Sequence, residues 1–346
     1  MYLKDLLKYR NVWLGIAMIW IVLYHTNFGF DSELLRSIKS SGYGGVDICL
    51  FASGIGCYYS LSKDPDAAHF LKRRIVRIMP TYWIFIICWL VYRYVNDMFK
   101  WDMAIGNIFA VQNFTTRGNE FNWYISAILL FYILTPYFKR LVDRLSFFTN
   151  ILIIGLLIVF TLPFWNSYTF IITVTRLPIY YMGVLCGKLC LQNKRMKPVY
   201  LLLLLAMFIA GVMMWRYNMK QDFSIRWYHG LYWYPFILIT PPLCVGLSYM
   251  AHYIGKIKVF NWLIDGISIV GKYSFEVYLV HILLMDIIFK LLPKVSGDSV
   301  TLLWVTGALC LFLACFALSQ LARLFRFLFS KLKDIVAPLI FDKNNI

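Results

Sequence analysis

Two ionisable side chains lie inside the first two long apolar segments of the chain, where they could do chemistry. His25 is near the end of the first segment, and Asp47 is near the start of the second. Hydrocarbon does not solvate ionisable groups, so at membrane depth they are more often functional than incidental. A carboxylate beside an imidazole fixes the ring tautomer and stabilises the imidazolium, as a general base requires. The pair predicts either such a base or a structural hydrogen bond.

The positions of the two residues predict how they meet. Each lies on the outer side of its segment's midpoint, by roughly 6–8 Å at about 1.5 Å per residue. An antiparallel pair of membrane helices would therefore bring His25 and Asp47 to the same depth.

A basic run precedes the third apolar segment and consists of Lys72, Arg73, Arg74 and Arg77. Residues three apart share a helix face, so Arg74 and Arg77 would point the same way. Two guanidinium groups on one face suit a diphosphate, because each can bind phosphate oxygens with paired hydrogen bonds. Pro80, which follows, predicts the start of a helix. The alternative is a topogenic cluster that contacts lipid headgroups.

Three residues near predicted outer ends of membrane segments are candidates for binding an acceptor. Glu120 and Trp123 are one helical turn apart, as in a sugar-binding pair, or they are a solvated carboxylate beside an interfacial tryptophan. Arg176 opens a later segment from the outer side. It would contact the acceptor or pair with Asp47 or Glu120.

Other polar residues are weaker candidates. Glu276 and His281 lie within the ninth apolar segment, but their separation of five residues places them on different helix faces. Trp227 and Tyr228 lie in an outer segment that is rich in aromatic residues. The eight cysteines all lie in apolar segments without the spacing of metal ligands, so we expect buried thiols and no metal site.

The composition places these residues in a membrane. Of the 346 residues, 61% are hydrophobic and only 15% are charged, which a soluble domain would not show. The net charge of +17 is typical of basic cytoplasmic loops rather than of nucleic-acid binding.

The apolar residues fall into segments long enough to cross a bilayer as helices. We predict ten spans, with ends uncertain by several residues, at about 13–30, 43–61, 80–95, 122–138, 147–164, 177–191, 199–216, 232–251, 273–291 and 300–321. Most of the 34 Lys and Arg residues then lie on one side, which predicts cytoplasmic termini at both ends. Residues 1–346 would form a single, all-α integral-membrane domain.

Several motifs in order resemble membrane acyltransferase family 3, a family of bacterial integral-membrane O-acyltransferases. The resemblance covers about residues 10–285 and is carried by short motifs. These are Gly15-Ile16-Ala17 leading to His25, Gly45-Val46-Asp47 with Ser53-Gly54, the arginine run through Pro80-x-Tyr82-Trp83, Trp123-Tyr124-Ile125, Arg176-x-Pro178 with Gly183, and Tyr273-Ser274-Phe275 leading to Tyr278-Leu279-x-His281.

The resemblance implies a catalytic role for His25, active-site support from Asp47 and Ser53, and binding of coenzyme A by Arg74 and Arg77. Family members commonly have a basic residue where this chain has Leu14. Arg10, one turn earlier, is the substitute that we expect.

The resemblance further implies transfer of an acyl group, usually acetyl, from cytoplasmic acyl-CoA to a hydroxyl of an extracytoplasmic glycan or glycolipid. We expect no permanently bound cofactor, a bacterial plasma-membrane location, contacts with membrane lipid but not with nucleic acid, and compatibility with a homo-oligomer. Direct transfer and a two-step route through acyl-histidine both remain open. The alternative functions are a transporter, with His25, Asp47, Glu276 and His281 along its path, and a flippase for a glycan precursor.

Overall fold

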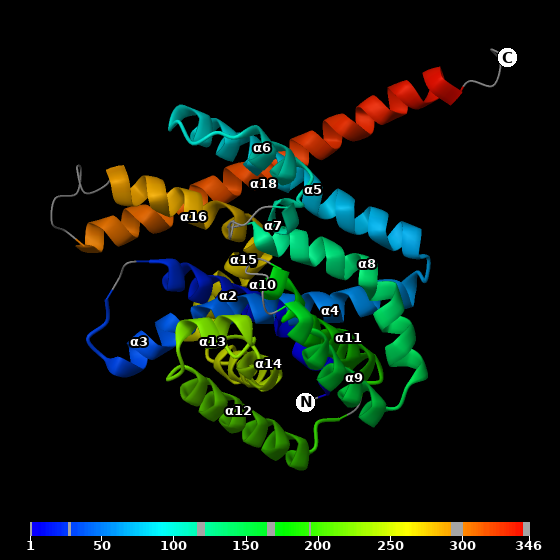
Figure 1. Cartoon of the computed structure of the whole chain (residues 1–346), viewed down its shortest axis with the longest axis vertical. Coiled ribbons are helices and arrows are strands. Elements are labelled where there is room, and N and C mark those ends of the chain that lie inside the picture. Colours follow the sequence, from blue (N-terminus) through cyan, green and yellow to red (C-terminus); the bar gives the residue numbers. More distant parts are fainter. Residues whose placement is uncertain are drawn as a thin grey trace. The chain divides into compact units, whose positions relative to one another are not determined.

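The computed structural model describes residues 2–26, 29–115, 122–164, 170–193, 195–291 and 300–341. Within these ranges the secondary structure is helical, apart from one isolated bridge between Tyr2 and Arg195 (Figure 1). The predicted all-α fold is confirmed.

The helices belong to two compact units, residues 1–72 with 105–274, and residues 73–104 with 275–346. The longer helices of the first unit are α2 (Arg10–His25), α4 (Gly45–Lys63), α8 (Trp123–Arg144), α9 (Phe147–Phe160), α11 (Leu177–Leu191), α12 (Pro198–Asn218), α14 (Pro235–Ile254) and α15 (Lys258–Lys272). Its shorter elements are α1 (Leu3–Leu6), η1 (Leu7–Tyr9), α3 (Glu33–Ser40), η2 (Gly42–Gly44), α7 (Gln112–Thr115), η3 (Leu162–Phe164), α10 (Phe170–Val174) and α13 (Phe223–Tyr228). The second unit holds α16 (Ser274–Leu291), α18 (Val300–Phe341) and most of α5 (Ala67–Val95), and the boundary between the units falls within α6 (Trp101–Ile108).

Local signals explain where several helices begin. Pro178, Pro198 and Pro235 lie in the first turns of α11, α12 and α14, where a missing backbone N–H costs nothing. Ser146 caps α9 by accepting a hydrogen bond from the backbone nitrogen of Thr149 at 3.1 Å. These starts agree within a few residues with the predicted spans.

The start of the third predicted span is wrong. Pro80 lies inside α5, a continuous helix of 29 residues, and not at its beginning. A proline inside a helix removes one backbone hydrogen bond but does not always end the helix. The basic run is therefore helical, as the predicted shared face of Arg74 and Arg77 requires.

Eight helices are long and apolar enough to cross a membrane in the described part of the chain, or nine if α15 and α16 together form one span. The predicted span at 43–61 is absent from this set, although it forms the 19-residue helix α4. Asp47 and several glycines and serines make α4 less apolar than the other long helices. α15 was not predicted; it breaks from α16 at Tyr273 and packs against α2.

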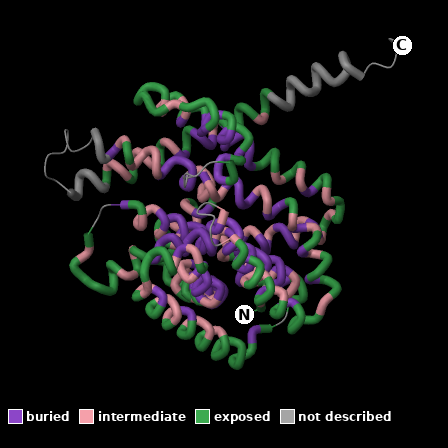
Figure 2. The backbone as a smooth tube through the Cα atoms, in the orientation of Figure 1, coloured by how far each residue is buried: buried purple, intermediate pink, exposed green. Residues whose placement is uncertain are grey.

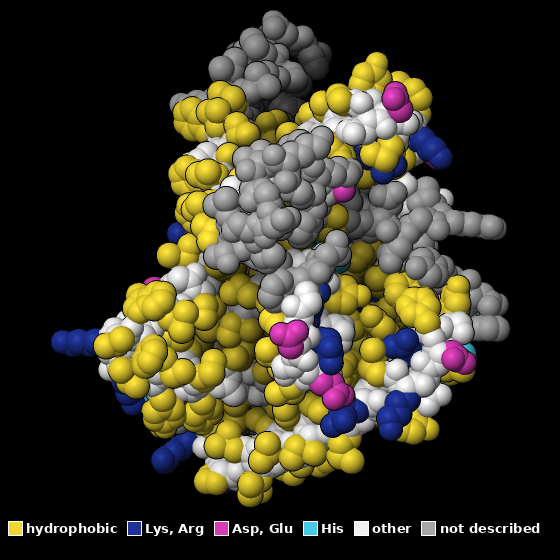
Figure 3. Space-filling view, turned by 90° about the vertical axis from the view of Figure 1, so that its left-hand side faces the viewer, with side chains coloured by type: hydrophobic (Ala, Val, Ile, Leu, Met, Phe, Trp, Pro, Cys, Tyr) yellow, Lys and Arg dark blue, Asp and Glu magenta, His cyan; other side chains and the backbone are white. Residues whose placement is uncertain are grey.

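The core of the first unit lies where α4 meets α2 and α11. α4 packs most extensively on α11, and buried residues gather along both helices (Figure 2). α12 contacts α14 but leaves most of its apolar side chains exposed, as lipid-facing helices do. Hydrophobic side chains also dominate the described surface in Figure 3, where Lys and Arg occupy scattered positions.

Close approaches at glycines let α4 and α11 pack together. A Cβ atom on Gly183 would lie 2.3 Å from the carbonyl oxygen of Phe51, and one on Gly54 would lie 2.5 Å from that of Tyr180. Small residues at helix crossings are typical of membrane bundles, since they allow the backbones to touch. The crossing gives a packing reason for the two glycines of the sequence motifs.

Candidate active site

His25 ends α2 and has a defined tautomer. Its Nδ1 atom lies 3.0 Å from the backbone carbonyl oxygen of Ile21. A carbonyl oxygen can only accept, so Nδ1 carries the proton in this hydrogen bond, and Nε2 is the basic nitrogen of the neutral ring. The side chain is exposed, and its ring meets the ring of Tyr24 edge-on at 4.9 Å. A backbone carbonyl thus has the orienting role that was predicted for Asp47.

Asp47 lies in the first turn of α4, beside a part of α2 that is farther from His25 than predicted. A Cβ atom on Gly42 would contact Trp20 and Tyr24, whereas one on Gly45 would contact Ala17 and Ile21. α4 therefore runs antiparallel to α2. Two residues beyond Gly45, Asp47 lies roughly two turns of α2, or about 10 Å, from the level of His25. The prediction that both residues share one depth is wrong.

Asp47 interacts electrostatically with a second buried charge, that of Arg176. Asp47 and Arg176 are 2% and 1% exposed, and their opposite charges interact. The Nη1 atom of Arg176 donates to the carbonyl oxygen of Ile172 at 2.9 Å, and its guanidinium carbon lies 4.6 Å from the Trp123 ring and 4.7 Å from the Trp233 ring. The predicted roles of Arg176, contact with the acceptor or pairing with a carboxylate, stay predictions.

One oxygen of the Asp47 carboxylate lacks a hydrogen-bond partner among the described residues. This atom, Oδ2, is buried. A buried polar atom without a partner is costly, and functional sites are where such atoms are most often kept. Oδ2 is therefore a candidate contact for a substrate hydroxyl.

Three tyrosines connect His25 with the buried charges. The Tyr24 ring contacts both His25 and Tyr43, and Tyr43 stacks on Tyr232 with ring centres 4.1 Å apart. The Tyr43 hydroxyl donates to the Tyr232 carbonyl oxygen at 3.0 Å, and the charges of Asp47 and Arg176 act on it. The Tyr43 hydroxyl also accepts a hydrogen bond from Trp215 Nε1 at 3.0 Å. Sequence reasoning missed these tyrosines; their position beside predicted outer span ends was the available signal.

The family model described as an acyltransferase domain matches residues 11–324 of the chain. The chain belongs to this family, acyltransferase family 3. No curated protein and no solved structure matches the chain. With its apolar helices, the family match makes the protein a multi-pass membrane acyltransferase.

Two other predicted residues of this acyltransferase meet farther along α4, Ser53 on α4 itself and Arg10 at the start of α2. The Ser53 hydroxyl is 3.4 Å from that of Tyr132 in α8, and Arg10 donates through Nε to the Ala52 carbonyl oxygen at 3.3 Å. Arg10 is thus held against α4 next to Ser53. The predicted roles of both residues remain predictions.

The basic run of the acyltransferase lies on the first turns of α5. Lys72 belongs to the first unit, and the three arginines belong to the second. Arg73 and Arg77 are exposed, while Arg74 is half-buried. The carboxylate of Glu276 interacts with the charge of Arg77.

The remaining predicted site residues differ in their surroundings. His281 is buried in α16, and its Nδ1 atom donates to the Tyr278 carbonyl oxygen at 2.7 Å. Trp227 in α13 packs against Trp233, with ring centres 5.0 Å apart, and so joins the aromatic group around Arg176. Tyr228 ends α13. Glu120 lies outside the described residues.

Sequence reasoning also missed a group of buried amides before α8. Asn107, Gln112, Asn113 and Asn122 are at most 1% exposed. Asn122 donates to Asn107, and Asn113 donates to the Thr173 hydroxyl at 3.2 Å. Amide side chains within an otherwise apolar outer segment were the signal for this group. These contacts tie the segments that lead into Trp123 and Arg176 to their neighbours.

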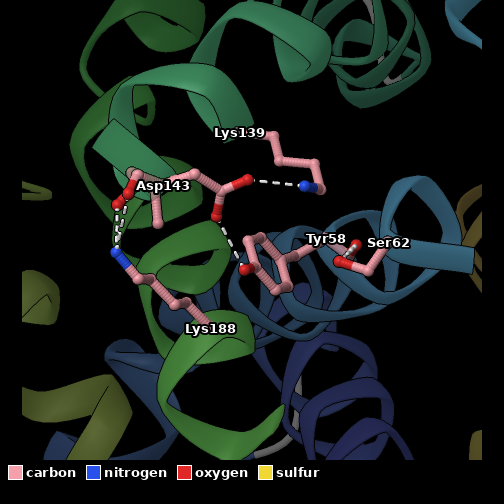
Figure 4. A network of polar contacts seen from close by, with 6 residues as sticks. Tyr58, Ser62, Lys139, Asp143 and Lys188 are labelled. Atoms are coloured by element: carbon pink, nitrogen blue, oxygen red, sulfur yellow. Dashed lines mark hydrogen bonds and ion pairs between the residues drawn. The ribbon is translucent and has the colours of Figure 1, made fainter. Parts of the chain in front are cut away.

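A polar network far along α4 from Asp47 joins α4, α8 and α11 (Figure 4). Asp143 accepts from the Tyr58 hydroxyl at 2.7 Å and from Lys139 Nζ at 2.6 Å. Lys188 Nζ donates to the carbonyl oxygens of Val142 and Asp143 at 2.6 and 3.3 Å. The network holds together the three helices that carry or adjoin Asp47, Trp123 and Arg176.

Proposed function

We propose that the protein is an O-acyltransferase that transfers an acetyl group from acyl-CoA to a hydroxyl of an extracytoplasmic glycan or glycolipid. One observation carries this proposal: within an acyltransferase family member, His25 presents Nε2 as its basic nitrogen at the exposed end of α2. A base of this kind suits the removal of a proton from a hydroxyl.

In the proposed reaction, Nε2 of His25 takes the proton of the acceptor hydroxyl as its oxygen attacks the thioester carbonyl carbon. The new C–O bond forms, the C–S bond breaks, and the imidazolium returns the proton to the departing CoA thiolate. No net charge is gained or lost by the enzyme. A route in which Nε2 itself first takes the acyl group uses the same nitrogen.

Aromatic rings and buried charges support an acceptor that is a sugar. The rings of Trp123 and Trp233 lie on Arg176, and Tyr43 stacks on Tyr232, so aromatic rings and polar atoms occur together in this region. Oδ2 of Asp47 would accept a hydrogen bond from a sugar hydroxyl. Glycans combine both features, since their rings carry apolar C–H faces and many hydroxyls.

The arginine run supports CoA as the donor. Arg74 and Arg77 follow one another at helical spacing on α5, with Lys72 and Arg73 beside them. Guanidinium groups bind phosphate oxygens with charge-assisted hydrogen bonds, and CoA carries three phosphates. We place the enzyme in a bacterial plasma membrane, with this run on the cytoplasmic side, as its charge distribution favours.

Label transfer tests the proposal. Membranes containing the wild type, His25→Ala or Arg74→Ala/Arg77→Ala would be given acetyl-CoA labelled in its acetyl group, together with glycan from cells lacking the gene. We expect base-labile label in the glycan with the wild type and background label with both variants. Equal labelling with His25→Ala, at equal protein levels, would contradict the proposal.

A further inference from the structure

Three arginines of the second unit act electrostatically on one carboxylate. The positive charges of Arg77 in α5 and of Arg323 and Arg326 in α18 all act on the Glu276 carboxylate in α16. Arg323 and Arg326 are three residues apart, so they share a face of α18. Neither residue belongs to the motifs by which the chain resembles its family.

The packing of the three helices brings these arginines to one end of the unit. The Tyr92 hydroxyl of α5 donates to Asp286 of α16 at 2.5 Å, so α5 and α16 run in the same direction from Arg77 and Glu276. A Cβ atom on Gly307 of α18 would lie 3.8 Å from Ile288, so the early part of α18 lies beside the late part of α16, away from Glu276. α18 therefore runs antiparallel to α16.

This register agrees with the contacts of Cys315, which follows Gly307 on α18 and interacts with Glu276. Arg323 and Arg326 come two to three turns later, beyond Glu276. Arg73 and Arg74 precede Arg77 on α5, so they lie at the same end. The arginines of both helices therefore converge.

The cluster of Arg77, Arg323, Arg326 and Glu276 has a net positive charge. Three guanidinium groups act on a single carboxylate, and Arg77 and Arg323 are exposed while Arg326 is half-buried. Guanidinium groups from two converging helices can bind several oxygens of one phosphate. Guanidinium groups on a single helix face reach fewer of these oxygens.

We propose that Arg323 and Arg326 complete, together with Arg77, a binding site for a phosphate group of the acyl-CoA donor. This inference rests on the proposed function and adds α18 to the donor site. The same phosphate chemistry occurs in lipid headgroups, so the test must separate the two sources.

CoA binding by the full-length protein tests the inference. The wild type and Arg323→Gln/Arg326→Gln would be reconstituted in nanodiscs of neutral phosphatidylcholine, and the Kd for CoA would be measured by calorimetry. We expect the double variant to bind CoA about tenfold more weakly or worse, because it loses charge-assisted hydrogen bonds. Arg323→Lys/Arg326→Lys, which keeps the charges, should recover part of the affinity.

A matched control removes the same charge elsewhere. Arg140 and Arg144 are both exposed on α8, and Arg140→Gln/Arg144→Gln should bind CoA within about twofold of the wild type. The single variants Arg323→Gln and Arg326→Gln would replace the double variant if its melting temperature shows that it does not fold. Each is expected to weaken CoA binding.

Four outcomes would overturn the inference. The first is unchanged CoA affinity in the folded glutamine variants. The second is unchanged CoA affinity together with reduced retention of phosphatidylglycerol, measured in separate nanodiscs that contain this lipid, which would assign the cluster to lipid headgroups. The third is a wild-type protein that binds no CoA, which would defeat the proposed donor as well. The fourth is that the glutamine variants transfer acyl groups as fast as the wild type and with the same KM for acyl-CoA, which would defeat this inference alone.

Discussion

At the scale of single residues, the proposed chemistry depends on which nitrogen of His25 is basic. The Ile21 carbonyl oxygen accepts a hydrogen bond from Nδ1, which leaves Nε2 as the basic nitrogen. Asp47 instead lies with Arg176 among aromatic rings. We therefore propose separate tasks for the two ionisable residues, proton transfer for His25 and support of the acceptor site for Asp47.

Replacing His25 tests its task directly. We expect His25→Gln to lower acyl transfer by about 10²–10⁴-fold, because no other group replaces the base. His229 is a matched control, since its Nδ1 atom contacts the Ile225 carbonyl oxygen at 3.2 Å in the same way at the end of α13. His229→Gln should retain activity within about twofold, measured as acetyl label in the glycan. Similar losses in both variants would contradict the assignment.

The charges of Asp47 and Arg176 should be coupled. Asp47→Asn or Arg176→Gln leaves one buried charge without its opposite, at a cost of about 3–5 kcal/mol in the free energy of unfolding. The double variant should lose less than the sum of the two single losses, by roughly 1–3 kcal/mol. Denaturant unfolding of the purified proteins in detergent measures all three changes. Additive losses would show that the two charges act independently.

The sequence identified the ionisable residues of the site but not their grouping. His25, Asp47 and Arg176 stand out because charged groups are rare in apolar segments. Their partners are a backbone carbonyl and the faces of tryptophans far away in the chain, which leave no charge pattern. The depth of Asp47 was missed because it depends on how far α4 slides along α2.

At the scale of helices, the crossing of α4 and α11 should tolerate no added side chain. We expect Gly183→Ala to lower the free energy of unfolding by about 1–3 kcal/mol, because its Cβ atom would meet the Phe51 backbone. Gly155 on α9 has no neighbouring atom within 4 Å of an added Cβ atom, so Gly155→Ala should be neutral or stabilising by up to about 1 kcal/mol. Equal effects in denaturant unfolding would contradict the close packing.

Helix positions were largely predictable, because each apolar run is long enough to span a bilayer and several begin at proline. α15 was missed because apolar and polar residues alternate along it at helical spacing, so it resembles a loop in a search for continuous apolar runs. The extent of α5 through Pro80 was also missed. Packing around the proline, which a local rule cannot include, decides whether the helix continues.

At the scale of the whole molecule, the number of spans decides whether the two termini lie on the same side of the membrane. Eight or nine described helices pass the length and apolarity test, and α4 adds a buried helix to them. Ten spans predict that both termini lie on the cytoplasmic side. A reporter active only in the cytoplasm should therefore be active when fused to either terminus. Activity at one end alone would require an odd number of spans.

The central claim is that the protein places acyl groups from acyl-CoA on a glycan by means of His25. Mass spectrometry of glycans from cells lacking the gene, complemented by the wild type or by His25→Ala, tests it most directly. We expect that only the wild type restores a mass increment of one acetyl group. Restoration of the same increment by His25→Ala, at equal protein levels, would contradict it.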